Sequence, residues 1–487
     1  MIKAAIKNKL KIIILFLLLF AFSACKKLIE VDAPTTSVNS KNIFDKDVTA
    51  ASVLTGIYTN LSSAGIQSGG LTSMSYLASL SSDELSRYGE LFGIENMYFT
   101  NTLDGQTGGY EFWNNIYPVI YVLNASLEGL NESKTLTPAV KQQLIGEAKF
   151  MRAFCFFYLV NLYGNVPLVI TTDYKVNSTM PRTDKDQVWG QIIADLKDAE
   201  ALLNSGYLDA TLLKITEERV RPNKMVATAL LSRVYLYRKE WQKAEEQATL
   251  VLNNPTYSLV NLQQVFKRNS KEAIWQLQPV TKGYNAPEAL TFIIDPVNGF
   301  RSPVYLSQRL LSCFDIGDLR KINWIGNSLV GGVNYSYAYK YKALPSAPDV
   351  ASSEYPTIFR LGEQYLIRAE ARIQQNKISD GINDLNTLRN RATDKTVPPE
   401  SQLKLLSNDL SKEKALLAVE KERRTELFTE WGHRWLDLKR TDRIDEVMTK
   451  EVPLKIAGGF WKTYKQWYPL PKSDLINNPK LTQNVGY

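Results

Sequence analysis

Long stretches of this chain repeat their apolar residues every three or four positions, and this spacing limits the fold more than any other feature. In the stretch that begins at Asp47, for example, the repeat runs through Ala51, Leu54 and Tyr58. Such a period places apolar side chains on one face of an α-helix. We therefore expect a mostly α-helical fold, with helices over residues 47–61, 112–130, 138–163, 188–203, 224–238, 241–252, 361–374, 378–391 and 413–439.

Some of these expected helices follow one another after very short turns. The clearest case is the pair 224–238 and 241–252. Closely spaced helix pairs are typical of tetratricopeptide-like helix–turn–helix repeats. Ala229, Arg233 and Tyr237 add small and aromatic residues at helical spacing, as interlocked helix pairs require. We expect this repeat scaffold to cover about 112–252 and 360–440.

Two irregular segments, about 62–110 and 257–356, interrupt the helical pattern and are rich in Gly, Asn and Tyr. Within the second segment, tyrosines alternate with other residues at Tyr335, Tyr337, Tyr339 and Tyr341, which predicts a half-buried strand over this stretch. Long ordered loops in compact proteins often carry function. We therefore expect the ligand-binding face to be built from these two segments, with a few short strands.

The first 25 residues have the form of an export signal that ends in a cysteine. Lys3, Lys7, Lys9 and Lys11 precede an apolar run, Ile12–Phe22, and Ser23 and Ala24 stand directly before Cys25. The run is too short for a membrane-spanning helix, which needs about 20 residues, but it suits a secretory signal peptide. Small residues before a cysteine resemble a bacterial lipobox. We expect residues 1–24 to be removed, Cys25 to be lipidated, and residues 25–487 to form one domain.

The composition of the remaining chain excludes several classes of protein. Losing the four lysines lowers the formal net charge from +8 to +4, and the mature chain has no polybasic block of a nucleic-acid binder. The lone His433 excludes zinc sites built on several histidines. No calcium-binding loop of alternating aspartates is present. We therefore expect no nucleic-acid partner, no metal and no cofactor, and a structural role for His433.

Besides Cys25, the chain holds only Cys155 and Cys313. An exported protein could join them in a disulfide. Cys155, however, lies within an apolar run, Phe154–Phe157, which favours a buried free thiol.

Distinctive motifs occur in the second half of the chain. Residues 422–427 read Glu-Arg-Arg-Thr-Glu-Leu, and residues 430–440 read Glu-Trp-Gly-His-Arg-Trp-Leu-Asp-Leu-Lys-Arg. They resemble the signature helix of the SusD/RagB family of outer-membrane nutrient-binding lipoproteins. Further similar stretches are 147–154, 163–168, 359–371, 385–392 and 468–487, together with Asp83, Trp113, Tyr117 and Asn124. From the residues alone, the charged stretch 420–439 predicts a scaffold element, because its opposite charges alternate beside bulky apolar residues.

The resemblance implies a non-enzymatic protein that captures a nutrient at the cell exterior. Its ligand would be a glycan or oligosaccharide, and its partner a SusC-like TonB-dependent transporter of the outer membrane. Aromatic rings stack on the apolar faces of sugars, and polar side chains bind the hydroxyls. Our leading candidate for ligand binding is Trp324, in a polar loop, although a tryptophan buried in the core fits the sequence at least as well. The other candidates are Tyr337, Tyr284, Tyr98, Asn101 and Arg87, and the irregular segments also hold Tyr76, Tyr88, Phe300 and Tyr305.

Two other functions fit parts of the sequence. A surface glycoside hydrolase would need two carboxyl groups roughly 5–10 Å apart, and the loops offer Glu84, Glu90, Glu95 and Asp104. A helical-repeat scaffold that binds a peptide or protein is the second alternative. The long aromatic-rich segments argue against it, because a pure repeat array shows a regular period throughout.

Overall fold

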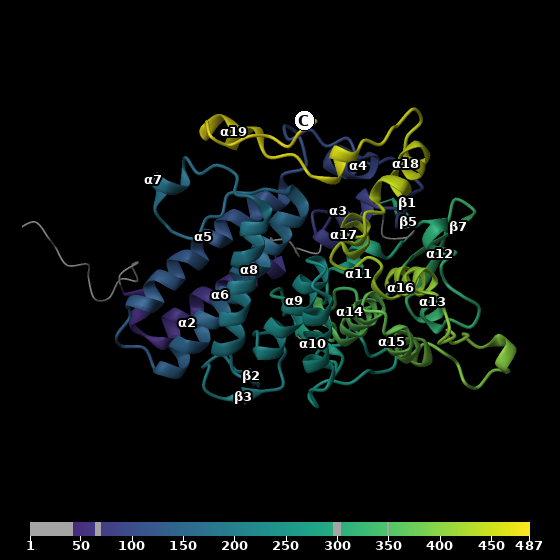
Figure 1. The fold of residues 1–487 in the computed structure, drawn as a ribbon, viewed down its shortest axis with the longest axis horizontal. Coiled ribbons are helices and arrows are strands. Elements are labelled where there is room, and N and C mark those ends of the chain that lie inside the picture. The colour runs from purple at the N-terminus through teal and green to yellow at the C-terminus, as the bar shows by residue number, and fades with distance from the viewer. Residues whose placement is uncertain (1–41, 64–69, 296–302, 348–349) are drawn as a thin grey trace, which may run out of the picture.

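The computed structural model describes residues 42–63, 70–295, 303–347 and 350–487. The expected signal peptide, the lipidation site Cys25 and the candidate Phe300 lie outside these residues. The described chain is mostly α-helical, as the apolar period predicts (Figure 1). Its α-helices are α2 (Asp47–Ser63), α3 (Met74–Ser81), α4 (Gly93–Thr100), α5 (Glu111–Glu132), α6 (Pro138–Tyr163), α7 (Tyr174–Asn177), α8 (Lys185–Leu202), α9 (Lys224–Tyr237), α10 (Trp241–Leu252), α11 (Glu288–Phe292), α12 (Gln308–Leu311), α13 (Leu319–Asn323), α14 (Leu361–Gln374), α15 (Ile378–Arg391), α16 (Lys412–Leu427), α17 (His433–Arg440), α18 (Ile444–Lys455) and α19 (Lys472–Asn477).

The strands are short and pair two by two, always antiparallel. The expected strand at Tyr335–Tyr341 corresponds to β7, which ends earlier, at Ala338. The pairs are β1 (Leu85–Arg87) with β5 (Val304–Leu306), β2 (Tyr207–Leu208) with β3 (Ile215–Thr216), β4 (Ala273–Gln276) with β8 (Thr357–Arg360), and β6 (Ile325–Val330) with β7 (Val333–Ala338).

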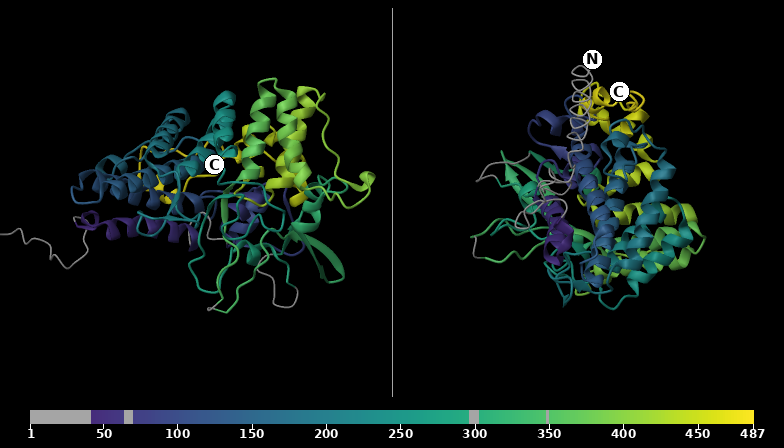
Figure 2. Two further views of the ribbon diagram at one scale, coloured as in Figure 1. Left: turned by 90° about the horizontal axis from the view of Figure 1, so that it is seen from below. Right: turned by 90° about the vertical axis from the view of Figure 1, so that its left-hand side faces the viewer.

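The long helices pack side by side in a series, which fits the expected helix–turn–helix repeats. Helix α6 packs against α5 and α8, α9 against α10, and α14 against α10 and α15. Seen from below, these helices form one layer, and the loops and the β6–β7 hairpin extend from one side of this layer (Figure 2). Among the described residues, no helix is long and apolar enough to cross a membrane.

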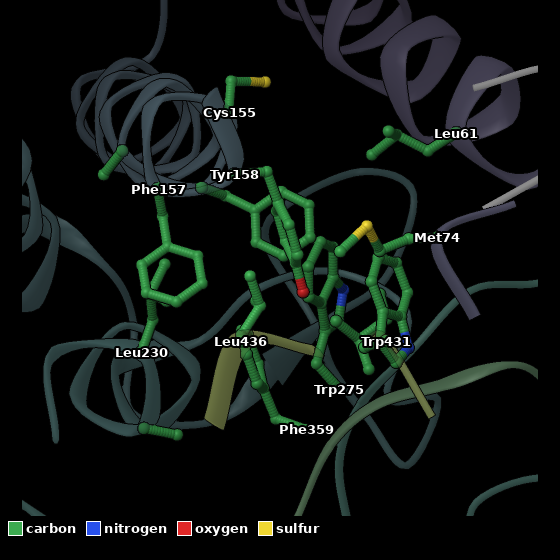
Figure 3. Close-up of a cluster of buried hydrophobic side chains, with 14 of the residues drawn as sticks. Leu61, Met74, Cys155, Phe157, Tyr158, Leu230, Trp275, Phe359, Trp431 and Leu436 are labelled. Carbon is green, nitrogen blue, oxygen red and sulfur yellow. The ribbon is translucent and has the colours of Figure 1, made fainter. Parts of the chain in front are cut away.

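The core contains many aromatic side chains contributed by distant segments. Tyr158 of α6, Trp275 of β4, Phe359 of β8 and Trp431 lie together in the cluster of Figure 3. Cys155 is buried there as a free thiol, as its apolar surroundings predict. Cys313 is also free, so these two cysteines form no disulfide in this structure.

One prediction for the first irregular segment is wrong, because residues 62–110 contain two helices, α3 and α4. All eight residues of α3 are buried. A helix that is covered on every side has no polar face, so its sequence lacks the period that marks an amphipathic helix.

A second correction concerns the stretch 413–439, which forms two helices rather than one. Helix α16 ends at Leu427 and α17 begins at His433. Between them, Thr429, Trp431 and Gly432 have left-handed backbone conformations, with φ of 55°, 48° and 70°. The resulting turn brings Gly432 against α3, where a Cβ atom would lie 2.4 Å from Cε of Met74.

Several charged residues of α16 and α17 are buried, and they pair mainly with other elements. Arg320 donates to Glu422 and Glu426 of α16 at 2.6 and 2.9 Å. Arg360 of β8 donates to Glu426 at 2.6 Å and to Glu430 at 2.8 Å. These contacts support a scaffold role for the motif, although the charges connect separate elements more than they connect positions along one helix.

Candidate functional site

Three tyrosine rings from distant parts of the sequence meet at the side of the molecule that carries the short strands. The ring centroid of Tyr335 lies 4.7 Å from that of Tyr88 and 4.9 Å from that of Tyr305. The rings of Tyr88 and Tyr305 are 6.5 Å apart. All three side chains are half-buried. We call these three residues the tyrosine cluster.

Pairing between β1 and β5 positions two of the rings. Ser86 lies opposite Tyr305 in the ladder, and the Tyr88 N–H donates to the carbonyl of Pro303 at 2.9 Å. Residues two apart on a strand point to the same face, so Tyr88 follows Ser86 toward Tyr305. Arg87, between them, points to the opposite face.

The third ring comes from the β6–β7 hairpin. Its turn, Gly331-Gly332, has φ of 58° and 82°, which matches the positive values that tight two-residue hairpins require. Across the hairpin, Tyr335 pairs with Ser328 and Tyr337 with Gly326. A Cβ atom on Gly326 would lie 2.4 Å from the Tyr337 ring, so glycine leaves room for that ring.

The same hairpin face extends beyond the tyrosine cluster. The rings of Tyr337 and Tyr339 lie 5.7 Å apart at right angles, and the Nζ atom of Lys342 lies 5.2 Å from the Tyr339 ring centroid. Burial, with a smaller contribution from Tyr335, raises the pKa of Tyr88 to about 12. Burial also raises the pKa of Tyr337, helped by Tyr339 and Asp295. Both phenols therefore keep their protons at neutral pH.

This arrangement suits binding rather than chemistry. Its phenol rings offer apolar faces with hydroxyl groups at their edges. A sugar ring presents the complementary surface, an apolar C–H face bordered by hydroxyls, and shallow aromatic surfaces of this kind fix such ligands. Among the described residues, no group of three or more His, Cys, Asp or Glu side chains is arranged to hold a metal ion.

The structure places our leading candidate, Trp324, in the core instead of on this surface. The Trp324 side chain has no exposed area, and its indole N–H donates to the Leu262 carbonyl at 3.0 Å. Nζ of Lys340 lies 5.0 Å from its ring centroid. The ring therefore has no face for a ligand in this structure, and its role is to cover buried charges.

Three further candidates are also core residues. The hydroxyl of Tyr98 donates to Glu111 at 2.6 Å, and that of Tyr76 donates to Glu95 at 2.6 Å; neither ring is exposed. Asn101 ends α4 in a left-handed conformation, with φ of 54°, and its amide donates to the Ser81 carbonyl at 3.1 Å. These residues hold the fold around the site and do not form its surface.

The remaining candidates are accessible to different degrees. Tyr337 lies on the hairpin face beside the tyrosine cluster. Tyr284 is 41% exposed on a separate loop, where its carbonyl accepts from the Ser352 hydroxyl. Arg87 is half-buried, with its guanidinium 5.6 Å from the Phe99 ring centroid. Tyr337 and Tyr284 remain candidates, whereas Arg87 faces away from the three rings.

Our choice of residues missed Tyr335, which contacts both other rings of the cluster. The alternation of tyrosines along β7 was the available signal, because it put Tyr335 and Tyr337 on one face. The pairing of β1 with β5, which brings in Tyr88 and Tyr305, has no local signal in the sequence.

Three of the loop carboxylates considered for glycoside hydrolysis bind neighbouring groups. Glu84 is buried and accepts from the Ser79 hydroxyl at 2.7 Å. Asp104 accepts from the backbone N–H groups of Gln106 and Thr107, both at 2.8 Å, and Glu95 accepts from Tyr76. These three acids stabilise local structure.

Comparison with known proteins agrees with the fold and the sequence motifs. A family model described as "SusD family" matches residues 322–487, and one described as "Starch-binding associating with outer membrane" matches residues 33–236. The chain belongs to the SusD/RagB family. A SusD-like protein of Formosa agariphila is 24% identical over 434 residues, which cover 77% of this chain and 79% of the relative.

Solved structures of SusD proteins have the same fold. A SusD superfamily protein from Bacteroides vulgatus superposes with a TM-score of 0.75 at 21% identity, covering 91% of this chain and 99% of the other. A structure described as a laminarin-binding SusD-like protein has a TM-score of 0.69 at 22% identity, covering 90% and 99%. At this level of identity the likeness establishes the SusD fold alone.

Proposed function

We propose that this SusD/RagB protein captures a glycan at the cell surface and holds it on the tyrosine cluster. The observation that carries the proposal is the meeting of Tyr88, Tyr305 and Tyr335 in one half-buried cluster. Three strands from distant parts of the chain are needed to form it. Half-buried rings fixed by their neighbours lose little side-chain freedom when a ligand stacks on them, so the surface is preorganised.

The comparisons favour a carbohydrate over other nutrients. One matching family model is described as starch-binding, and a structural relative is described as laminarin-binding. Both descriptions concern glucose polymers, so glucan oligosaccharides are the first ligands to test. Capture without hydrolysis follows from the same proposal, because the site consists of phenols rather than paired carboxyl groups.

The proposal includes membrane attachment and delivery. We infer that Cys25 carries a lipid, that the anchor holds the protein at the outer face of the outer membrane, and that captured ligand passes to a TonB-dependent transporter. Support comes from the lipobox-like sequence before Cys25 and from the family description "associating with outer membrane".

Binding is tested with the mature chain, residues 25–487, and a panel of soluble glycans that includes laminarin, starch, a mannan and a xylan. We expect one glycan class to retard the protein in affinity gel electrophoresis, with no release of reducing ends on prolonged incubation. Retardation by none of a broad panel would contradict glycan capture, and steady release of reducing ends would favour the hydrolase alternative.

Attachment and delivery are tested in cells. Replacing Cys25 with Ala should move the protein from the membrane fraction to the soluble fraction, and the wild-type protein should co-purify with an outer-membrane transporter after gentle extraction. Continued membrane attachment of the Cys25→Ala variant would mean that the lipid anchor was wrongly assigned.

A further inference from the structure

The β6–β7 hairpin has one edge with a neighbouring strand and one edge without. On one side of the hairpin, β7 packs against β5. On the other side β6 is the outermost strand, and among the described helices and strands it packs closely only against β7 and against α13, which directly precedes it. The hairpin extends away from the helical layer (Figure 2). The outer edge of β6 is therefore open to another chain.

The hydrogen-bond pattern of the hairpin shows which backbone groups form this edge. The Tyr339 N–H donates to the Trp324 carbonyl at 2.8 Å, so these two residues are a hydrogen-bonded pair. Hydrogen-bonded and non-hydrogen-bonded pairs alternate along an antiparallel ladder. Ile325, Asn327 and Leu329 therefore belong to non-hydrogen-bonded pairs, and their N–H and C=O groups point away from β7. Among the described residues, no other backbone group hydrogen-bonds to them.

The hairpin sequence lacks the features that protect an open edge. Proteins prevent unwanted strand pairing with charged residues, prolines, bulges or very short edge strands. Residues 325–338 contain no charged residue and no proline, and their register runs without a bulge. With six residues each, β6 and β7 are the longest of the described strands. Leu329 is 66% exposed, and Ile322 of α13 is 76% exposed beside the edge. These features favour a strand partner.

We propose that β6 pairs antiparallel with β6 of a second copy of this chain, centred on Asn327. An extended backbone offers donors and acceptors at the spacing of this edge, and a second β6 does so without any charge repulsion. In this register Asn327 lies opposite Asn327 of the second copy, and Leu329 lies opposite Ile325. All three outward-pointing residues are then paired on both copies, as a two-fold symmetric contact requires.

The pairing has a consequence for the candidate site. Residues directly opposite each other in a sheet share a face, and neighbours along a strand alternate between faces. The two Asn327 side chains therefore lie on one face of a four-stranded sheet, and Tyr335 and Tyr337 of both copies lie on the other. A long glycan that meets both copies gains affinity from two linked contacts. This consequence rests on the proposed glycan capture, whereas the pairing itself does not.

A disulfide across the centre of the pair is the direct test. Asn327→Cys is made in the mature chain, residues 25–487, with Cys25→Ala and Cys313→Ser, which leaves the buried Cys155 as the one other thiol. Cα atoms of a hydrogen-bonded antiparallel pair lie about 5.5 Å apart, and a disulfide spans about 4.4–6.8 Å. We expect a covalent dimer as the main product of mild oxidation.

The matched control is Asn334→Cys in the same background. Asn334 is exposed on β7 of the same hairpin, away from the proposed contact, so this variant should stay mostly monomeric. Equal dimer yields from the two variants, or no dimer from Asn327→Cys, would overturn the proposal.

A charge swap tests the register without a covalent bond. The Asn327 side chain is exposed and accepts one surface hydrogen bond, from the Ser336 hydroxyl at 2.7 Å, so we expect its variants to fold. Asn327→Lys and Asn327→Glu each place two like charges directly opposite each other, which should weaken self-association about threefold or more. A mixture of the two variants should associate at least as tightly as wild type, because opposite charges then face each other.

Sedimentation measures these affinities. A single strand pair makes a small interface, so the concentration series extends into the millimolar range. A mixture that associates no more tightly than either variant alone would contradict the register. A wild-type chain that stays monomeric throughout would overturn the proposal and favour an extended segment of another protein on this edge. Neither experiment uses a glycan, so its failure is distinct from a failure of glycan capture.

Discussion

Arg434 and Asp83 form a buried ion pair between residues that lie 351 positions apart in the sequence. Nε of Arg434 donates to Oδ1 of Asp83 at 2.7 Å, and the second nitrogen, Nη2, donates to Oδ2 at 3.0 Å. Arg424 donates to the same carboxylate at 2.7 Å. The pair connects α17 to the segment that leads into β1, and β1 leads directly to Tyr88. The SusD/RagB motif thus helps to hold the segment that carries Tyr88 in place.

Replacing Arg434 with Ala should destabilise the fold by about 3–5 kcal/mol, because it leaves the buried Asp83 carboxylate with one partner instead of two. Equilibrium unfolding in urea measures the loss. The matched control is Lys450→Ala, which removes a solvent-exposed pair with Glu446 and should change stability by less than about 1 kcal/mol. An Arg434→Ala protein with wild-type stability and lost glycan binding would contradict the scaffold role.

Glu84 should make stability depend on pH. Burial raises the pKa of its carboxyl from an ordinary 4.5 to about 7, partly opposed by the hydrogen bond from Ser79. A carboxyl group whose pKa is raised by folding stabilises the folded protein fully below pH 4.5, and this stabilisation is lost as the pH rises through about 7. The loss amounts to roughly 3 kcal/mol, at 1.36 kcal/mol for each pKa unit.

The measurement compares wild type with Glu84→Gln, whose amide stays neutral and can still accept from Ser79. Burial and nearby arginines hold the pKa of His433 well below its ordinary 6.5, so His433 also makes stability depend on pH, and the difference between wild type and Glu84→Gln is the quantity that matters. We expect the variant to gain stability relative to wild type as the pH rises from about 5 to 8. Parallel curves would show that Glu84 ionises at its ordinary pKa.

Trp324→Ala should weaken the fold and leave the ligand surface intact. Removing a fully buried tryptophan creates a cavity and costs about 3–5 kcal/mol. It also uncovers the buried Lys340. Trp324→Phe keeps most of the side-chain volume and should lose clearly less stability than Trp324→Ala. The melting temperatures and glycan affinities of both variants test this prediction. A Trp324→Ala protein with wild-type stability that no longer binds glycan would show that Trp324 belongs to the ligand-binding site.

Two glycines should respond to alanine in opposite directions. At Gly432, φ is 70° and a Cβ atom would lie 2.4 Å from Met74, so Gly432→Ala should destabilise by about 1–3 kcal/mol. Gly190 lies within α8 with open space around it, so Gly190→Ala should stabilise by about 0.5–1 kcal/mol. Thermal unfolding of both variants measures the contrast, and equal effects would mean that the turn between α16 and α17 is wrongly described.

The sequence predicted the helices whose apolar residues recur on one face, such as α10 and α15, since burial on one side leaves a period. It did not predict α3, which is buried all round. Trp324 was misplaced because its polar neighbours suggest a surface loop, whereas its covering residues, Leu262 and Lys340, come from elsewhere in the chain.

The tyrosine cluster, too, could be predicted only in part from the sequence. The alternation along β7 predicted that Tyr335 and Tyr337 share a face. The contact with Tyr88 and Tyr305 depends on the register between β1 and β5, and a shift of one residue would reverse every side chain. No local pattern in these three-residue strands sets that register, so only the structure reveals which tyrosines meet.

The most direct test of the account is a calorimetric titration of Tyr335→Ala with whichever glycan the wild-type protein binds. Tyr335 contacts both other rings of the cluster, so its loss should weaken binding about tenfold or more while the fold remains intact. Tyr174→Ala removes a tyrosine that is 72% exposed on α7, away from the strands, and should bind as wild type does (Figure 1). Equal affinities for wild type and Tyr335→Ala would contradict glycan capture by the tyrosine cluster.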